Sequence, residues 1–240
     1  ISPHFAYRYY ISIDWKELYN GRSIEDAIID TITWRKAYGI HRLAIANRTR
    51  VVEMIRNGLA YTSLTGDKRG RSIVHLKLAR NLRLEDAKDY IDLLMYTMER
   101  ADRHCETLQS GEFIAIVDLE GFTWSKTPPA DLWKDCIGML KRHYPYRLSA
   151  VYIVNTSSVF QLIWHIVKPL LSKKAIGKVS VLGSVHSDPK TRNLLVEQIG
   201  AAYLEDVYGG EQKEIFHPDK STEEDVKTYL KQGYWSTAAR

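Results

Sequence analysis

The sequence is poor in cysteine and has no long hydrophobic run. Its 240 residues include only Cys105 and Cys136, too few for a disulfide framework. This usage favours a reducing compartment, so we expect a cytoplasmic protein. No stretch approaches the roughly 20 apolar residues of a transmembrane helix, so we expect no spanning segment. The chain begins at Ile1 instead of Met, so we expect a trimmed chain and infer nothing from the lack of a signal peptide.

Motifs of several function classes are also missing. No G-x-G-x-x-G follows a strand and no G-x-x-x-x-G-K-[ST] occurs, so the two commonest phosphate-binding loops are absent. The stretch "LGSVH" places Ser184 after a strand, but it lacks the last glycine of a nucleophile elbow. The eight histidines have no metal-ligand spacing, and no basic stripe is interleaved with aromatic residues. We therefore expect no catalytic residue, no metal, no cofactor and no nucleic-acid partner.

Polar residues at the ends of predicted strands give weak evidence for a functional site. Asp118 and Glu120 lie at the end of an apolar strand, where catalytic residues of α/β proteins often lie. We expect Asp118 instead to accept hydrogen bonds from the backbone of the following loop. His186 and Asp188 are close enough in sequence to share a site, but a solvated turn is the expected structure.

What is present indicates a globular α/β protein. Hydrophobic residues make up 45% and charged residues 26%, and the net charge of +5 is mildly basic. "SIEDAIIDTITWRKAYG" has Ser23 and Asp26 in a capping-box pattern and Gly39 at the C-cap, which predicts a helix. Turn chemistry is predicted at 65–71. The predicted strands cover 72–79, 112–119, 148–155 and 177–184, and the predicted helices cover 84–108, 130–143 and 189–199. This alternation from residue 71 onward favours a largely parallel sheet, with residues 1–60 expected to be helical.

The stretch "VFQLIWHIVKPLL", 159–171, is too apolar for a bare surface helix. Nine of its thirteen residues are apolar, and its polar side chains Gln161, His165 and Lys168 form one narrow stripe. Pro169 is expected to kink or end the helix. Three interpretations remain open: a buried core helix, a helix between protein on one side and a hydrophobic ligand or membrane on the other, or an oligomer interface.

Several stretches together resemble the CRAL-TRIO family of lipid-binding domains. They are, in chain order, "AIIDTITWRKAYGI", "DKRGRSIVHL", "IVDLEGF", "HYPYRLSAVYIVNTSSVFQLIWHIVKPLL", "KVSVLGS" and "LEDVYGG", and the likeness spans roughly residues 7–210. The resemblance implies an α/β CRAL-TRIO fold, a mostly parallel β-sheet flanked by helices that enclose a hydrophobic cavity, with an N-terminal helical region. It implies a helical region over 1–60, a lipid-binding domain over 61–210 and a C-terminal extension over 211–240.

The resemblance also assigns candidate site residues. In the family, the segment that matches 159–171 is a gate over the cavity, and Phe160, Trp164, Lys168 and Pro169 match its motif positions. The predicted gate residues are Phe160, Trp164, Val167, Lys168 and Pro169. Period-2 alternation places Phe113, Ala115, Val117, Val151 and Ile153 toward the cavity. Ser184 and His186 are candidates for contacts with a polar part of the ligand. For all these residues, plain core packing is the alternative.

The resemblance leaves the identity of the ligand open. Family members that hold phosphatidylcholine use two hydroxyl side chains at the positions of Phe113 and Ala115, and those that hold phosphatidylinositol have Glu at the position of Tyr146. The implied function is binding and intermembrane transfer or presentation of a phospholipid or other lipid, without catalysis. The implied partners are that ligand and, transiently, a membrane surface. The alternatives are a regulatory membrane-recruitment or interaction module of a larger signalling protein and an α/β enzyme.

Overall fold

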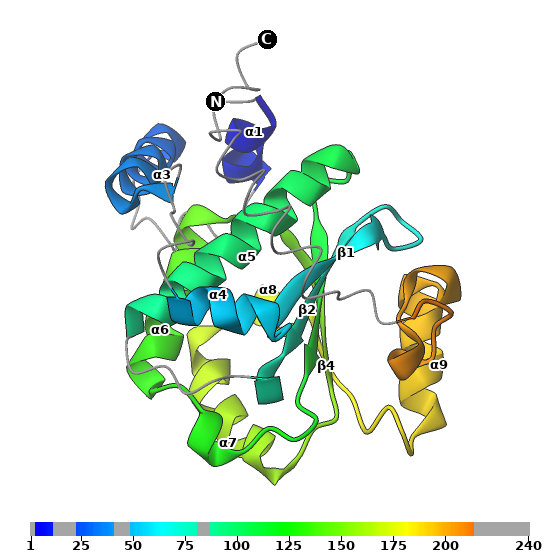
Figure 1. The fold of residues 1–240 in the computed structure, drawn as a ribbon. Helices are drawn as coiled ribbons and strands as arrows, with labels where there is room; N and C mark the ends of the chain where they lie inside the picture. Colours follow the sequence, from blue (N-terminus) through cyan, green and yellow to red (C-terminus); the bar gives the residue numbers. More distant parts are fainter. Residues whose placement is uncertain (1–2, 12–22, 41–48, 81–86, 214–240) are drawn as a thin grey trace.

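The structure is a computed structural model that describes residues 3–11, 23–40, 49–80 and 87–213 (Figure 1). The strands of the described sheet are β1 (Ala60–Gly66), β2 (Ser72–Lys77), β3 (Phe113–Asp118), β4 (Leu148–Val154) and β5 (Val179–Val181). The described α-helices are α1 (Pro3–Ile11), α3 (Ile24–Tyr38), α4 (Thr49–Arg56), α5 (Ala87–Thr107), α6 (Ala130–His143), α7 (Ser158–Val167), α8 (Lys173–Ile176) and α9 (Pro189–Ile199). Short 3-10 segments are η3 (Leu78–Arg80), η4 (Trp124–Lys126), η5 (Lys168–Leu170), η6 (Ala201–Tyr203) and η7 (Asp206–Tyr208).

The strands lie side by side in chain order, β1-β2-β3-β4-β5. β1 pairs antiparallel with β2, and all the other pairs are parallel. Parallel neighbours require crossover connections, and right-handed crossovers in this strand order place every connecting helix on the same face. In Figure 1, α5, α6 and α7 lie on one side of the sheet and α9 on the other. The predicted α/β fold with a mostly parallel sheet and N-terminal helices is confirmed.

Side chains of the parallel strands alternate between two apolar layers, as the pleat requires. The layer toward α9 contains Ile73, Ile114, Ile116, Tyr152 and Val154, packed with Leu195 and Ile199. The layer toward α5 contains Val74, Phe113 and Ala115, packed with Met98, Ala101 and Cys105. The sheet is therefore covered on both faces, which explains why its central strands are almost continuously apolar.

The strand β1 was not predicted, because residues up to 60 were expected to be helical and 61–64 were left unassigned. Its first residues, 60–63, are all buried, so the sequence shows no alternation of apolar and polar residues there. The polar ones are satisfied by distant partners. Arg100 of α5 donates to the Thr62 hydroxyl (2.9 Å), and the Ser63 hydroxyl lies 2.9 Å from Nε2 of His75. A strand whose polar residues are paired with other elements is difficult to predict from its own short sequence.

The turn predicted over 65–71 is confirmed from Asp67 onward, whereas residues 65 and 66 belong to β1. Asp67 and Arg71 stabilise this turn. One oxygen of the Asp67 carboxylate accepts from the backbone N–H groups of Arg69 and Arg71, and the other accepts from Nε of Arg71 (2.8 Å). Nη1 of Arg71 also donates to Ser149 of β4 (2.9 Å). The turn is therefore tied to the centre of the sheet.

The helix predictions agree closely with the structure. Ser23 caps α3 in a capping box with Asp26, and Gly39 ends it in the left-handed conformation, with φ of 74°. The predicted helices 130–143 and 189–199 match α6 and α9. The predicted helix 84–108 corresponds to α5, with 84–86 outside the described residues. The strand predicted over 177–184 is shorter in the structure, where β5 covers only Val179–Val181.

The N-terminal helices dock on α5 and α6 through polar contacts. Arg35 of α3 forms two hydrogen bonds with the buried Glu99 carboxylate (2.8 and 2.7 Å), which also accepts from the Tyr144 hydroxyl (2.6 Å). Beside them, Trp34 stacks on the ring of His143 with centroids 4.0 Å apart. A bidentate pair fixes both distance and angle, so it orients α3 on the α5 and α6 layer.

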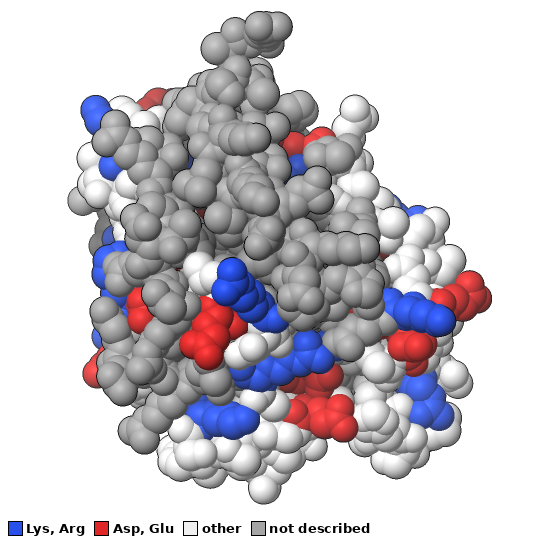
Figure 2. All heavy atoms as spheres, in the orientation of Figure 1, with Lys and Arg blue, Asp and Glu red and all other residues white. Residues whose placement is uncertain are grey.

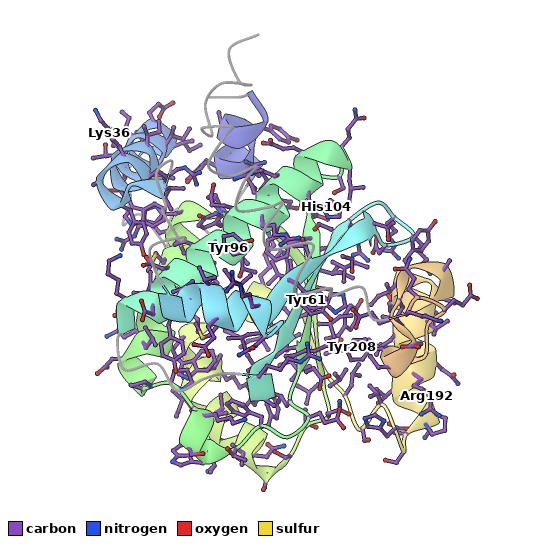
Figure 3. The ribbon with its side chains drawn as sticks, in the orientation of Figure 1. Lys36, Tyr61, Tyr96, His104, Arg192 and Tyr208 are labelled. Atoms are coloured by element: carbon purple, nitrogen blue, oxygen red, sulfur yellow. The ribbon has the colours of Figure 1, made fainter. Side chains whose placement is uncertain are left out.

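The segment after α9 folds back onto the sheet through buried polar side chains. The Glu205 carboxylate accepts from the Tyr61 hydroxyl (2.8 Å) and pairs with Lys77 at the end of β2 (3.4 Å). The Tyr208 hydroxyl donates to Asp118 at the end of β3 (2.9 Å). Figure 3 shows Tyr61 and Tyr208 in the layer between the sheet and α9. The tail thus completes the face that α9 covers only in part.

Replacing Gly210 with Ala tests how tightly this tail is packed. A Cβ atom at Gly210 would lie 1.9 Å from the carbonyl oxygen of Leu204, a contact that no side-chain rotation relieves. We expect Gly210→Ala to lower the free energy of unfolding by about 3 kcal/mol or more. The control Gly138→Ala adds a Cβ on α6 with nothing within 4 Å and is expected to be neutral or stabilising. Urea denaturation measures both, and equal stability of the two variants would contradict the packing.

The buried His143 predicts a dependence of stability on pH. The Tyr9 hydroxyl donates to Thr31 (2.7 Å), whose hydroxyl lies 2.9 Å from Nδ1 of His143. Burial, with Arg142 and Arg35 nearby, lowers the pKa of His143 from 6.5 to about 3. The folded state therefore keeps the ring neutral while the unfolded state takes up a proton below 6.5.

Stability is consequently expected to fall as the pH is lowered from 6.5 toward 3. The slope from this residue is at most about 1.4 kcal/mol per pH unit. In His143→Gln, which cannot take up the proton, the unfolding free energy should depend less steeply on pH over this range. Urea denaturation at pH 7, 6, 5 and 4 measures the slopes, and parallel profiles would exclude His143 as the cause.

Candidate functional site

The cavity positions predicted from the sequence lie on the sheet face that α5, α6 and α7 cover. Phe113 and Ala115 belong to the buried layer against α5. Val117 and Ile153 belong to a second buried cluster, and Val151 packs against both. The alternation therefore placed these side chains on a common face. Their contact with a ligand stays a prediction.

The second cluster, here named the α7 cluster, joins the sheet to α7. Its buried members are Leu119, Phe122, Ile153, Phe160 and Ile163. Partly buried residues packed against it are Leu78, Val117, Trp133, Val151, Val159, Trp164, Val167 and Val179. It combines apolar and aromatic side chains from three strands (β3, β4 and β5), η3, the loop after β3, α6 and α7.

The inner face of α7 contributes the predicted gate residues to this cluster. Phe160 and Ile163 are buried, and Trp164 and Val167 are partly buried against them. The rings of Phe160 and Trp164 stack with centroids 5.8 Å apart. The structure thus brings Phe160, Trp164 and Val167 together with the predicted cavity positions.

The outer face of α7 is exposed. It carries the polar stripe of Gln161 and His165, and also Leu162, whose exposed fraction is 57%. Lys168 and Pro169 are exposed as well. The α-helix ends at Val167 and continues as the 3-10 turn η5, because Pro169 has no N–H to donate. The predicted break at Pro169 is confirmed.

The side chains of α7 are held by apolar contact alone. The ring Nδ1 of His165 lies 2.7 Å from the carbonyl oxygen of Gln161, within the helix itself. Among the residues that the structure describes, no side chain of α7 forms a hydrogen bond or ion pair with another element. The helix therefore lacks the directional contacts that fix α3 in place.

The structure does not bring Ser184 and His186 into the α7 cluster. The Ser184 hydroxyl accepts from the backbone N–H groups of His186 (3.2 Å) and Ser187 (3.4 Å), so it stabilises a turn. His186 is exposed, with its Nε2 3.0 Å from an oxygen of Glu120. Asp188 caps α9 instead of sharing a site with His186. Both candidates lie at the carboxyl edge of the sheet, and their contact with a ligand stays a prediction.

Asp118 has the structural role expected of it. One of its oxygens accepts from the backbone N–H of Glu120 (2.9 Å) and from Nδ2 of Asn155 (2.8 Å). The other oxygen accepts from Tyr208. With three donors on a buried carboxylate, Asp118 joins the ends of β3 and β4 to the C-terminal tail.

Sequence reasoning missed a cationic pair at the opposite edge of the sheet. Tyr146 has a left-handed backbone, with φ of 55°, and leads into β4. The ammonium groups of Lys174 and Lys178 lie 4.8 and 5.5 Å from the centre of its ring. Two of the lysines that follow Pro169 therefore contact an aromatic ring.

Two further observations bear on function classes. Of the described helices, none is long and apolar enough to cross a bilayer. In the same part of the chain, no group of three or more His, Cys, Asp or Glu side chains is placed to hold a metal ion.

Comparison with known proteins identifies a family model and several relatives. The CRAL/TRIO domain model matches residues 56–210. A 102-residue stretch is 40% identical to the phosphatidylinositol/phosphatidylcholine transfer protein SFH4 of Arabidopsis thaliana, covering 40% of this chain and 15% of that protein. A 110-residue stretch is 32% identical to an alpha-tocopherol transfer protein-like protein of Mus musculus, covering 43% of this chain and 32% of that protein. The matched stretches therefore span a minor part of these relatives.

A solved structure supports the fold over a larger share of the chain. The crystal structure of Sfh5 superimposes with a TM-score of 0.64 and 15% identity, covering 95% of this chain and 80% of that one. The likeness extends from the N-terminal helices through the sheet. Because the family model matches residues 56–210, and the sheet and α7 follow one another in the predicted order, the chain belongs to the CRAL/TRIO domain family.

Proposed function

We propose that this chain binds a hydrophobic ligand, a phospholipid or another lipid, between its sheet and α7. We further propose that it transfers the ligand between membranes or presents it there without chemical change. The observation that carries this proposal is the attachment of α7 by apolar contact alone. A lipid chain can replace such contacts without leaving a polar group unpaired.

Exchanging the apolar contacts of α7 for contacts with lipid costs less free energy than exposing them to water. Exposing a side chain such as Phe160 or Ile163 to water costs about 1.5–3 kcal/mol each. Displacing them by a lipid chain, or moving them into the apolar part of a membrane, avoids most of that cost because water stays excluded. We therefore expect α7 to remain closed in water and to move when lipid or membrane takes over its contacts.

The outer surface of α7 is compatible with a membrane. Leu162 is exposed on it, and Lys168 and Lys173 are exposed on the segment that follows. In Figure 2, the lower rim of the molecule, where α7 lies in Figure 1, shows no charged side chain. An uncharged rim with the exposed Leu162, beside lysines, suits peripheral contact with an anionic bilayer.

The relatives support a lipid ligand but not one lipid. SFH4 is named for phosphatidylinositol and phosphatidylcholine, and the mouse relative is named for its likeness to a tocopherol transfer protein. Because these names differ in ligand, the proposal for this chain is limited to the class of hydrophobic lipids.

A regulatory role within a larger protein is the second candidate. It is favoured by the short share, 15%, of SFH4 that the matched stretch represents. In that role the fold would recruit a partner to a membrane, and lipid would stay bound instead of being transferred. Transfer between vesicles distinguishes the two functions.

Lipid extraction tests the proposal directly. The protein is purified after incubation with mixed vesicles, denatured and extracted with organic solvent, and the extract is analysed by mass spectrometry. We expect close to one lipid per protein molecule. A protein that stays empty and takes up no lipid would rule out the proposed function.

The variant Trp164→Asp tests the role of α7. Because Trp164 is only partly buried, a carboxylate there can reach water, and we expect the variant to fold. A charge at the edge of the α7 cluster opposes contact with lipid, so vesicle-to-vesicle transfer should fall by about tenfold or more. The control Tyr203→Asp changes an aromatic side chain with 37% exposure beside α9 and should retain transfer. Unchanged transfer in Trp164→Asp would remove Trp164 from the gate.

A further inference from the structure

Two buried polar atoms lie in the short stretch that leads from the loop after β3 into α6. Nε1 of Trp133 and the Thr127 hydroxyl oxygen are both shielded from solvent. Neither has a hydrogen-bond partner among the residues that the structure describes. Buried polar atoms are rarely left without one, so a group other than these residues is expected to supply it.

The position of Trp133 connects it to the proposed ligand site. Its side chain packs against the α7 cluster, together with Val117 and Trp164. Trp133 lies in the first turns of α6, where its backbone N–H bonds to the carbonyl of Pro129 (3.3 Å). The side chain is therefore held by a regular helix, and its indole N–H is a fixed donor at the edge of an apolar cluster.

The chemistry of the missing partner follows from the donor. An indole N–H can only donate, so its partner must be an acceptor. The α7 cluster consists of hydrophobic side chains, and the Lys126 ammonium, in the stretch before α6, donates to the carbonyl of Ala79 (2.5 Å). A charged phosphate is costly to place against apolar side chains, which favours a neutral acceptor. The partner is consequently a neutral oxygen.

We propose that a neutral oxygen of the bound lipid, an ester carbonyl or a hydroxyl, accepts a hydrogen bond from Nε1 of Trp133. The Thr127 hydroxyl provides a second polar contact to the same part of the ligand. This inference rests on the proposed function and specifies its ligand as an oxygen-bearing lipid whose polar atom enters the apolar cluster. A pure hydrocarbon would leave both atoms unpaired.

Matched lipid pairs test the proposal. The protein is incubated with vesicles that contain equal amounts of dioleoyl phosphatidylcholine and its di-ether analogue, which lacks the ester carbonyls. A second incubation uses cholesterol and cholestane, which lacks the hydroxyl. Mass spectrometry of the extracted protein gives the ratio within each pair. We expect a preference of about tenfold either for the ester lipid over its di-ether analogue or for cholesterol over cholestane, which also tells an ester from a hydroxyl ligand.

Two variants assign that preference to the named atoms. Trp133→Phe keeps an aromatic ring but removes the N–H, and it should bring the ratio close to one while the protein still takes up lipid. Thr127→Val keeps the shape of the side chain and should reduce the ratio by a smaller factor, about threefold. The control Trp124→Phe makes the same change at a tryptophan with 54% exposure and should leave the ratio as in the wild type.

A spectroscopic readout does not depend on how well the variants fold. In a ¹⁵N spectrum of the wild-type protein, the indole resonance of Trp133 is the one that is missing from the spectrum of Trp133→Phe. If that variant does not fold, the resonance is identified by its proximity to the methyl groups of α6. It should move downfield when the protein is loaded with the preferred lipid of a pair and not when it is loaded with the other member.

The possible results separate this inference from the proposed function. No lipid uptake in either pair would refute the proposed function itself. Uptake with a ratio near one in both pairs would overturn the hydrogen bond to Trp133 alone. A wild-type preference that persists in Trp133→Phe would overturn it as well, and would indicate that water satisfies the indole.

Discussion

The order of the strands is the constraint on which the arrangement of this molecule depends. Because β2 to β5 are parallel and follow chain order, right-handed crossovers place α5, α6 and α7 on one face of the sheet. The opposite face would be bare without α9 and the tail after it. The chain thus divides into a face built by crossovers and a face closed by its C-terminal end.

The segment after α9 and the helix α7 are held by different physical interactions. Buried hydrogen bonds and an ion pair connect the segment after α9 to the strand ends, as Glu205 does with Tyr61 and Lys77. Such contacts have fixed geometry and are costly to break one at a time. The contacts of α7 on the opposite face are apolar and non-directional. The segment after α9 is therefore suited to stay fixed, and α7 is suited to exchange its contacts.

Much of this architecture was predictable because its signals are local. The capping residues of α3, the 3.6-residue period of α6 and the apolar strands β3 and β4 are each readable within a short window. Period-2 alternation also placed Phe113, Ala115 and Ile153 on the face toward the crossover helices. For residues 159–171, periodicity alone left three interpretations open, and the resemblance added the interpretation as a gate, which stays a prediction.

The features that could not be predicted from the sequence depend on contacts with residues far away in the chain. The polar residues of β1 are buried because Arg100 and His75 reach them from other elements. Ser184 and His186 were candidates for ligand contacts, yet the backbone of their own turn and the side chain of Glu120 occupy them. Likewise, nothing local distinguishes Trp133 from an ordinary core residue, since a missing partner is visible only after every neighbour is placed.

The apolar α7 cluster and the indole N–H of Trp133 would contribute differently to selectivity among lipids. An apolar surface discriminates weakly between chains that differ by a methylene group, because each contact is small and the packing adapts. A buried donor discriminates far more strongly, since a ligand without an acceptor leaves it unpaired. Placing Trp133 at the edge of the α7 cluster would therefore let the length and branching of the lipid vary while its oxygen is required. Selection by a single polar atom would let such a site choose among lipids whose apolar chains are alike.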